Sequence, residues 1–237
     1  MLRTVKYGET SVIVLIFTEK FGTQSYLVNG VRTSTKKGSG KANLFQPTAI
    51  LDLVVYHNDS KSLQRIKEFK WGHLYKHILS DVPKNAVAVF MVELLTKCLK
   101  QPEAHEDLFH FCEDAFIHLD ESEGSAMANF PLFFALHLPV FLGLRMNAEY
   151  NDTHPILDLQ EGSFVAEKPT HPHFLEGKQA EVTNELLNVM QPDELMDIKL
   201  NHDFRRHLLQ AYEIYYALHI HDFGKMKTLP VLKELLS

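Results

Sequence analysis

The stretch Val12–Val31, with the sequence VIVLIFTEKFGTQSYLVNGV, decides how the first third of this chain folds. It begins with six consecutive apolar residues, four of them β-branched, and residues of this kind favour strands. After a short polar turn, a second run begins at Gly22 and has glycines near both of its ends. The stretch therefore predicts two consecutive strands, Val12–Phe17 and Gly22–Val31.

Three other segments in the same third of the chain carry strand patterns. We expect a strand around Leu2–Lys6, an apolar run fills Ala49–Tyr56, and apolar and polar residues alternate along Leu63–Phe69. Turn-forming Gly, Asn, Asp and Ser residues lie between these segments. Five short strands of this kind are typical of a small, strongly curved barrel such as the OB-fold.

Helical patterns replace the strand patterns from about Leu74 onward. An apolar helix that we expect to be buried begins near Pro83, and helical spacing recurs over Glu103–Leu119, Gln179–Met190 and Asp203–Ile220. A strand-like insert, Ile156–Val165, has Glu161-Gly162 at its centre, which is typical of a hairpin turn. The predicted fold class is therefore α+β: an N-terminal five-stranded OB-fold β-barrel, then an α-helical domain with a small β-hairpin insert at about 145–175.

The charge of the chain is unevenly distributed. Its 24 Lys and Arg against 30 Asp and Glu give a net charge of −6, which taken whole argues against a basic nucleic-acid-binding protein. Residues 1–76, however, hold 12 basic and 5 acidic residues, a net of +7, whereas residues 77–237 hold 12 and 25, a net of −13. This split predicts two domains with different partners, 1–76 and 77–237.

One uncharged segment, Gly124–Leu144, is long enough to cross a bilayer. Pro131 and Pro139 interrupt it, and an interior proline costs a helix about 3 kcal/mol. We therefore expect a buried core helix or a broken helix pair and no membrane association. The two cysteines, Cys98 and Cys112, lie in helical stretches without a CxxC pair, and we see no signal peptide, which together favour a reduced cytoplasmic setting.

No pattern in the chain matches an enzyme motif. The string Gly38–Lys41 departs from a phosphate-binding loop, since Thr35 stands where that loop begins with glycine and Ala42 follows the lysine. The close histidine pairs, at 171/173 and 219/221, have no HExxH motif and no neighbouring cysteine. We therefore expect no catalytic residue, no cofactor and no metal.

The segment Arg32–Lys41 carries four positive and no negative residues and lies between the third and fourth predicted strands. Cations on such a loop can neutralise DNA phosphates, and aromatic residues on the strands can stack on bases. The candidate aromatic residues are Tyr7, Tyr26, Phe45 and Tyr56. For the loop a solvated turn is the alternative, and for the aromatic residues it is the barrel core.

Several short motifs follow one another in a specific order. The first third carries Tyr7–Ser11, Phe17–Glu19, Gly22, Leu27–Arg32, Phe45–Pro47 and Leu53–Tyr56, and the end carries Leu218–Phe223, Lys227–Leu229 and Val231–Leu235. In this order and spacing they resemble the bacterial recombination mediators of the RecO family, and members of the Bacteroidetes type most. Family members usually have several residues before the counterpart of Leu2, which leaves open how the first strand closes the barrel.

This resemblance implies an OB-fold followed by a helical domain, and no enzymatic turnover. It implies binding of single- and double-stranded DNA, annealing of complementary strands and, with RecR, replacement of single-stranded-DNA-binding protein (SSB) by RecA in the cytoplasm, at the nucleoid. The family's basic loop falls on Arg32, Lys36, Lys37 and Lys41. Many members carry a four-cysteine zinc module where this chain has the cysteine-free Leu144–Val165, so the insert is expected to fold without metal.

The resemblance also implies a groove for the acidic SSB tail in the helical domain. Because that domain has a net charge of −13, we expect a local basic pocket, for which Arg145, Arg205 and Arg206 are the candidates. Two alternatives stay open at this point. One is an OB-fold interaction adaptor whose barrel binds an acidic protein tail and no nucleic acid, and the other is a metalloenzyme that uses the histidines and binds stoichiometric zinc.

Overall fold

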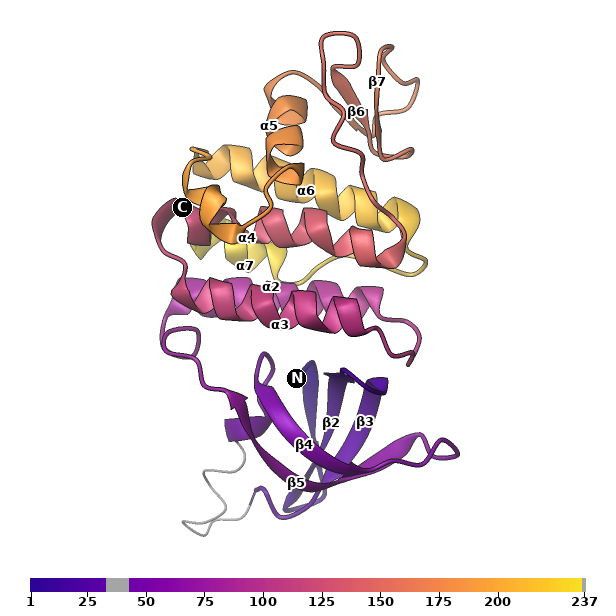
Figure 1. Cartoon of the computed structure of the whole chain (residues 1–237), viewed down its shortest axis with the longest axis vertical. Helices are drawn as coiled ribbons and strands as arrows, with labels where there is room; N and C mark the ends of the chain where they lie inside the picture. The colour runs from indigo at the N-terminus through magenta and orange to yellow at the C-terminus, as the bar shows by residue number, and fades with distance from the viewer. Residues whose placement is uncertain (33–42, 236–237) are drawn as a thin grey trace. The chain divides into compact units, whose positions relative to one another are not determined.

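The computed structural model describes residues 1–32 and 43–235, and the chain divides into two compact units. The first comprises residues 1–76 and 99–116, and the second comprises residues 77–98 and 117–237 (Figure 1). Helix α3, Glu106–Glu121, begins in the first unit and ends in the second. The domain limits 1–76 and 77–237 remain a prediction.

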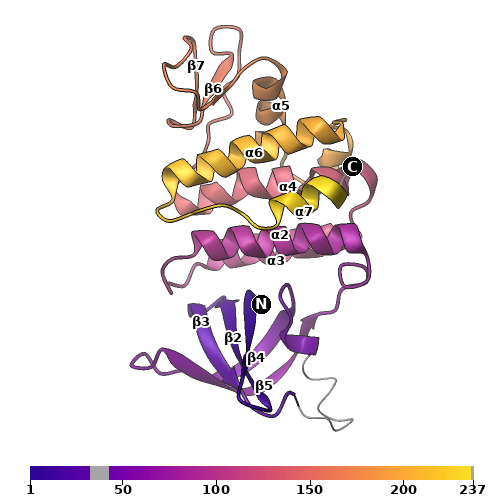
Figure 2. The ribbon, with the colours of Figure 1, turned by 180° about the vertical axis from the view of Figure 1, so that it is seen from behind.

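The first unit is built on one five-stranded sheet, seen from both sides in Figures 1 and 2. Its strands are β1 Arg3–Tyr7, β2 Ser11–Thr18, β3 Gly22–Val28, β4 Ile50–Tyr56 and β5 Leu63–His73, and the short helix η1 Asn43–Phe45 precedes β4. The order across the sheet is β1-β2-β3-β5-β4, and only the contact between β3 and β5 is parallel. The expected α+β class with an N-terminal five-stranded sheet is confirmed.

The sheet curves, but in the part of the chain that the structure describes its edge strands do not pair, so it does not close into a fully hydrogen-bonded barrel. β5 pairs with β3 through Leu63–Arg65 and with β4 along the rest of its length, where two register shifts mark bulges that bend the pair. Among the described residues, the edge strands β1 and β4 share no ladder. Their ends are joined near Met1, whose carbonyl accepts from the Thr48 amide at 3.0 Å and whose amino group donates to the Ala49 carbonyl at 2.9 Å.

Strand alternation places the core of the first unit on one face of the sheet. Val14 on β2 lies opposite Tyr26 on β3, and both are fully buried. The buried cluster consists of Val12, Val14, Ile16, Tyr26, Val28, Val31 and Phe45. Because neighbouring residues in a strand point to opposite faces, the intervening residues of β2 and β3 lie on the other face of the sheet.

The second unit is mostly helical. It contains α2 Val82–Cys98, the end of α3, α4 Gly124–His137, η2 Leu138–Leu142, α5 Lys178–Leu187, η3 Pro192–Met196, α6 His202–His219 and α7 Leu229–Leu235. Helical structure begins at Val82 and not near Leu74, because the backbone amides of His77 and Ile78 donate to the Asp120 carboxylate instead of to helix carbonyls. The helical spacing predicted within Glu103–Leu119 is confirmed by α3, which buries Leu108, Cys112, Ala115 and Leu119 on one face and half-buries Phe111.

The uncharged segment forms the centre of the second unit. Gly124–Leu142 has a mean hydropathy of 1.5, enough by length and composition to cross a membrane, but 61% of it is buried inside the protein. Its helix α4 contacts α2, α5, α6 and η3, and η2 starts at the point where Pro139 ends the α-helix. The segment is a broken helix pair in a folded core, as expected, but only Pro139 lies at the break, since α4 continues through Pro131.

The insert forms a small sheet of β6 Ile156–Asp158, β7 Ser163–Val165 and β8 Phe174–Leu175, in the order β7-β6-β8. The predicted hairpin turn is confirmed, with Gly162 at a φ of +66°. Asp158 accepts from the Gln160 and Glu161 amides and lies 3.2 Å from His171 Nε2. Buried Leu157, Phe164 and Leu175 give the sheet an apolar interior in place of cysteine thiolates.

Candidate nucleic-acid interface

The predicted basic loop is described only at its first residue. Arg32 follows buried Val31, its amide donates to the Thr10 carbonyl at 3.0 Å, and its guanidinium donates to the Gly8 carbonyl at 3.3 Å. These contacts place Arg32 beside the turn between β1 and β2. Lys36, Lys37 and Lys41 lie outside the described residues, so their DNA-binding role remains a prediction.

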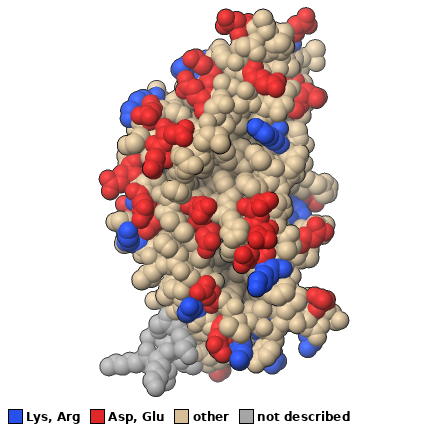
Figure 3. Space-filling view, in the orientation of Figure 1, with Lys and Arg blue, Asp and Glu red and all other residues tan. Residues whose placement is uncertain are grey.

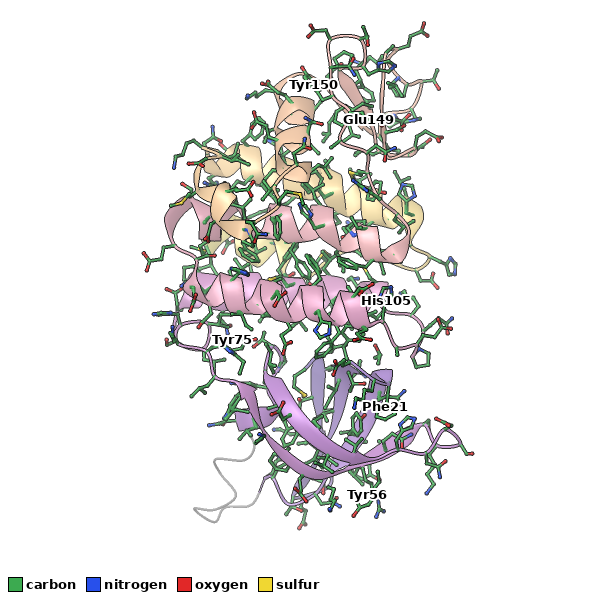
Figure 4. All side chains as sticks on the ribbon, in the orientation of Figure 1. Phe21, Tyr56, Tyr75, His105, Glu149 and Tyr150 are labelled. Atoms are coloured by element: carbon green, nitrogen blue, oxygen red, sulfur yellow. The ribbon has the colours of Figure 1, made fainter. Side chains whose placement is uncertain are left out.

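The four candidate aromatic residues divide into two pairs. Tyr26 and Phe45 are 0% and 1% exposed and belong to the barrel core. Tyr7 and Tyr56 are 54% and 62% exposed, and Figure 4 shows Tyr56 on the surface of the first unit. Only Tyr7 and Tyr56 can therefore stack on a base without unfolding the sheet.

Tyr56 ends a row of residues that crosses all five strands on the outer face of the sheet. The register aligns Val5 with Ile13, Ile13 with Leu27, Leu27 with Arg65, and Arg65 with Tyr56. A second row next to it runs through Arg3, Leu15, Ser25 and Leu63. We call these nine residues the outer stripe: Arg3, Val5, Ile13, Leu15, Ser25, Leu27, Tyr56, Leu63 and Arg65.

The outer stripe combines half-exposed apolar side chains with two cations and no carboxylate. Arg3 and Arg65 are exposed, and neither forms an ion pair with another of the residues that the structure describes. Acidic residues begin further along the same face, where Glu68 lies 3.3 Å from Lys67 and Asp52 lies 3.2 Å from Lys70. The stripe thus offers stacking surface and unneutralised positive charge together, the chemistry of single-stranded nucleic-acid binding.

Sequence reasoning missed Arg3 and Arg65. The period-two pattern of Leu63–Phe69 already places Leu63 and Arg65 on one face of β5. The pattern does not reveal the order of the strands in the sheet. In the structure β5 lies between β3 and β4, and this order brings Arg65 next to both Leu27 and Tyr56.

The three arginines predicted for partner binding have different surroundings. Arg205 Nε donates to Asn129 Oδ1 at 2.8 Å, and burial lowers the pKa of the guanidinium. Arg206 pairs with Asp203 at 3.1 Å across one helical turn. Arg145 is exposed, and the carbonyl of the preceding residue, Leu144, accepts a hydrogen bond from Tyr215 Oη. Tyr215 lies ten residues after Arg205 on α6, which is roughly 15 Å along the helix axis. The structure keeps Arg145 apart from the other two, and their partner-binding role remains a prediction.

The acidic character of the second unit is visible on the face that Figure 3 shows. On that face Asp and Glu side chains are spread over the helical part of the chain, with few Lys and Arg between them. Such a surface repels DNA phosphates. Nucleic-acid contacts are therefore favoured on the first unit.

The members of the two histidine pairs bond to other groups in the described structure. His219 Nε2 bonds the Leu159 carbonyl at 3.0 Å, whereas His221 lies beyond the end of α6, is exposed and pairs with Asp222, so the two imidazoles have different partners. His171 bonds Asp158, and its Nδ1 accepts from the His173 amide at 3.2 Å. Among the described residues, neither pair belongs to a group of three closely spaced ligands.

Comparison with known proteins covers both parts of the chain. Residues 1–75 match the family model described as recombination protein O N terminal, and residues 79–229 match the model described as recombination protein O C terminal. The DNA repair protein RecO of Christiangramia forsetii is 32% identical over 235 residues, covering 99% of this chain and 96% of the relative. That of Phocaeicola vulgatus is 33% identical over 237 residues, covering 100% and 97%, and that of Bacteroides fragilis is 33% identical over 238 residues. The chain therefore belongs to the RecO family of DNA repair and recombination proteins, with an OB-fold at its N-terminus.

Proposed function

We propose that this chain acts in DNA repair as a recombination mediator that binds single-stranded DNA on the outer stripe of its N-terminal sheet. The observation that carries the proposal is the row from Val5 to Tyr56, which places stacking surface beside the cations Arg3 and Arg65. The sequence adds four further cations between β3 and β4: Arg32, Lys36, Lys37 and Lys41. Phosphates bind the cations and bases stack on the exposed tyrosine.

Family membership supports the wider activity. The chain binds double-stranded DNA as well, anneals complementary strands, and with RecR promotes RecA loading onto SSB-coated single strands, in the cytoplasm at the nucleoid and without catalytic turnover. The acidic second unit binds protein partners, among them the SSB tail at Arg145, Arg205 or Arg206. Membership of the RecO family and the net charge of −13 on residues 77–237 support this division of labour.

The test measures affinity for a fluorescent oligothymidine as a function of salt. Six cations in contact with phosphates, the four of the loop with Arg3 and Arg65, give a log–log slope of about −4, since each contributes about 0.7 on single strands. Lys36/Lys37/Lys41→Ala reduces the slope by about 2, and Arg65→Ala reduces it by about 0.7. Tyr56→Ala weakens binding roughly 5- to 150-fold at every salt concentration without changing the slope, because stacking contributes about 1–3 kcal/mol per base.

Lys178→Ala is the matched control, because Lys178 is an exposed lysine on α5 of the acidic unit and is paired with Glu181 at 3.1 Å. It leaves affinity and slope unchanged. If Arg65→Ala and Tyr56→Ala also behave like this control, the outer stripe is not the binding surface. If the wild type and the Lys36/Lys37/Lys41→Ala variant anneal complementary strands equally well at low salt, the basic loop plays no part in annealing. Absence of oligonucleotide binding at about 50 mM salt favours the alternative, an adaptor whose barrel binds an acidic protein tail.

A further inference from the structure

A pocket of about 450 Å³ opens in the first unit beside the β2–β3 turn, and all of its lining residues belong to that unit. Its walls come from β2, β3, β4 and the first half of α3. Aromatic rings of Phe17, Phe21 and Phe109 line it, and Figure 4 labels Phe21 on the turn. Glu19, His110 and Glu113 also line it, so polar ligand atoms and apolar walls face the same space.

His110 is surrounded by three carboxylates. Its Nε2 atom lies 3.6 Å from Glu19 Oε1 and 3.8 Å from Glu106 Oε1, and its Nδ1 atom lies 3.9 Å from Glu113 Oε2. The ligand atoms of Glu19, Glu106 and His110 all lie within 4.8 Å of one another. No other such group of three His, Cys, Asp or Glu side chains occurs in residues 1–32 and 43–235.

These separations match two ligands that share a metal ion better than they match direct hydrogen bonds. A hydrogen bond between nitrogen and oxygen is about 2.7–3.2 Å long, shorter than all three contacts of His110. Two ligand atoms that each lie about 2.1 Å from a zinc ion at a tetrahedral angle are about 3.4 Å apart. Small side-chain rotations therefore bring Nε2 and the two carboxylate oxygens around one ion.

The ligands are held by two elements that already contact each other. Glu106 and His110 are one turn apart on α3 and so lie on one face of the helix. Glu19 lies on the β2–β3 turn, which Thr18 Oγ1 stabilises by accepting from the Phe21 amide and donating to the Gly22 carbonyl. Phe17 contacts Phe109 with ring centroids 5.8 Å apart, which fixes the turn near the helix.

The pocket can supply water to a metal ion bound by these ligands. Its volume of about 450 Å³ has room for several water molecules, and Glu19 and His110 line it. A zinc ion with three protein ligands takes water in its fourth position.

We propose that Glu19, Glu106 and His110 bind one divalent transition-metal ion of the zinc type at the mouth of this pocket, with water in the remaining position. Two carboxylates and one imidazole favour such an ion over Mg²⁺, which prefers oxygen ligands alone. The bound ion joins the β2–β3 turn to α3 and offsets the negative charge of the glutamates. The site is separate from the outer stripe and does not depend on the proposed DNA binding.

The test is isothermal titration of the chelator-treated full-length chain with ZnCl₂, and with MgCl₂ for comparison. The wild type binds one equivalent of Zn²⁺ in a saturable step and gives no such step with Mg²⁺. Glu19→Gln and His110→Gln each weaken that step by about tenfold or more, because each removes one ligand. Glu9→Gln is the control, since Glu9 is an exposed glutamate in the β1–β2 turn, at the opposite end of β2 from Glu19.

Thermal unfolding with and without Zn²⁺ provides a second readout. Zn²⁺ raises the midpoint of the wild type and of Glu9→Gln, and it raises that of Glu19→Gln and His110→Gln much less. If Zn²⁺ binds the two ligand variants as tightly as the wild type, the ion sits on other histidines and the proposal is wrong. Absence of a saturable equivalent in the folded wild type overturns it as well, leaving the cluster as surface ion pairs only.

Discussion

Arg205 is predicted to bind a partner, but its contacts also stabilise the second unit. The contribution of Arg205 to the free energy of unfolding can be measured. Its Nε donates to Oδ1 of Asn129, which is 0% exposed and whose amide nitrogen donates to the Leu195 and Ile198 carbonyls at 3.1 and 2.7 Å. Asn129 thus joins α4 to the segment around η3, and Arg205 on α6 satisfies its remaining oxygen.

The expected loss of stability depends on which buried polar groups each substitution leaves without a hydrogen-bond partner. Arg205→Ala leaves one buried amide oxygen, at a cost of about 1–3 kcal/mol, with the lower end expected if water enters beside the half-buried guanidinium. Asn129→Ala leaves two carbonyls and the Arg205 donor and costs more, about 2–5 kcal/mol. Arg206→Ala removes only a surface ion pair with Asp203 and costs less than about 1 kcal/mol.

Urea unfolding followed by far-UV circular dichroism reports mainly on the helical second unit. The single tryptophan, Trp71 on β5, reports on the first unit by fluorescence. We expect destabilisation in the order Asn129→Ala, Arg205→Ala, Arg206→Ala in the dichroism signal, with the Trp71 transition little changed. At roughly 3 °C per kcal/mol for a unit of this size, Arg205→Ala lowers the melting temperature by about 3–9 °C. If Arg205→Ala is as stable as Arg206→Ala, the hydrogen bond to Asn129 contributes nothing and Arg205 is free to serve a partner.

Three further substitutions test one feature of each unit: Gly22→Ala with its control Gly8→Ala in the first unit, and Glu93→Gln in the second. Gly22→Ala is expected to destabilise the first unit by well over 2 kcal/mol, because Gly22 has a φ of +60° and an added Cβ would lie 2.0 Å from the Glu103 carbonyl oxygen. Gly8→Ala, at a φ of +59° with nothing within 4 Å, costs only about 1 kcal/mol, and equal Trp71 unfolding midpoints for the two variants would contradict this reasoning. In the second unit, burial alone would raise the pKa of Glu93. The net effect is a lowered pKa, because the Glu93 carboxylate accepts hydrogen bonds from the Lys227 and Thr228 amides and from the Thr228 hydroxyl, and because the positive charge of Lys97 favours its ionised form. The carboxylate therefore stabilises the fold above its unfolded-state pKa, and this contribution is lost as the pH falls through the folded-state pKa. Glu93→Gln should lower stability at pH 7 and flatten its acid dependence between about pH 5 and 3, and parallel pH profiles for the wild type and the variant would refute this.

The local elements of this protein could be predicted from the sequence because each follows from the spacing of its own residues. Alternation along Leu63–Phe69 indicates β5, the β-branched run from Val12 indicates β2, and Pro139 within the apolar run Gly124–Leu144 indicates an interrupted core helix. The charge split between residues 1–76 and 77–237 also needed only counting.

Only the tertiary structure decided which of these residues meet. Tyr26 and Tyr56 are both tyrosines on predicted strands, but strand pairing buries the first and exposes the second. Arg65 lies beside Tyr56 because β5 inserts between β3 and β4, and Glu19 meets His110 across 91 positions of sequence because the first half of α3 packs against the sheet. Local spacing specifies secondary structure, whereas a surface or a ligand cluster depends on strand order and packing, which only long-range contacts determine.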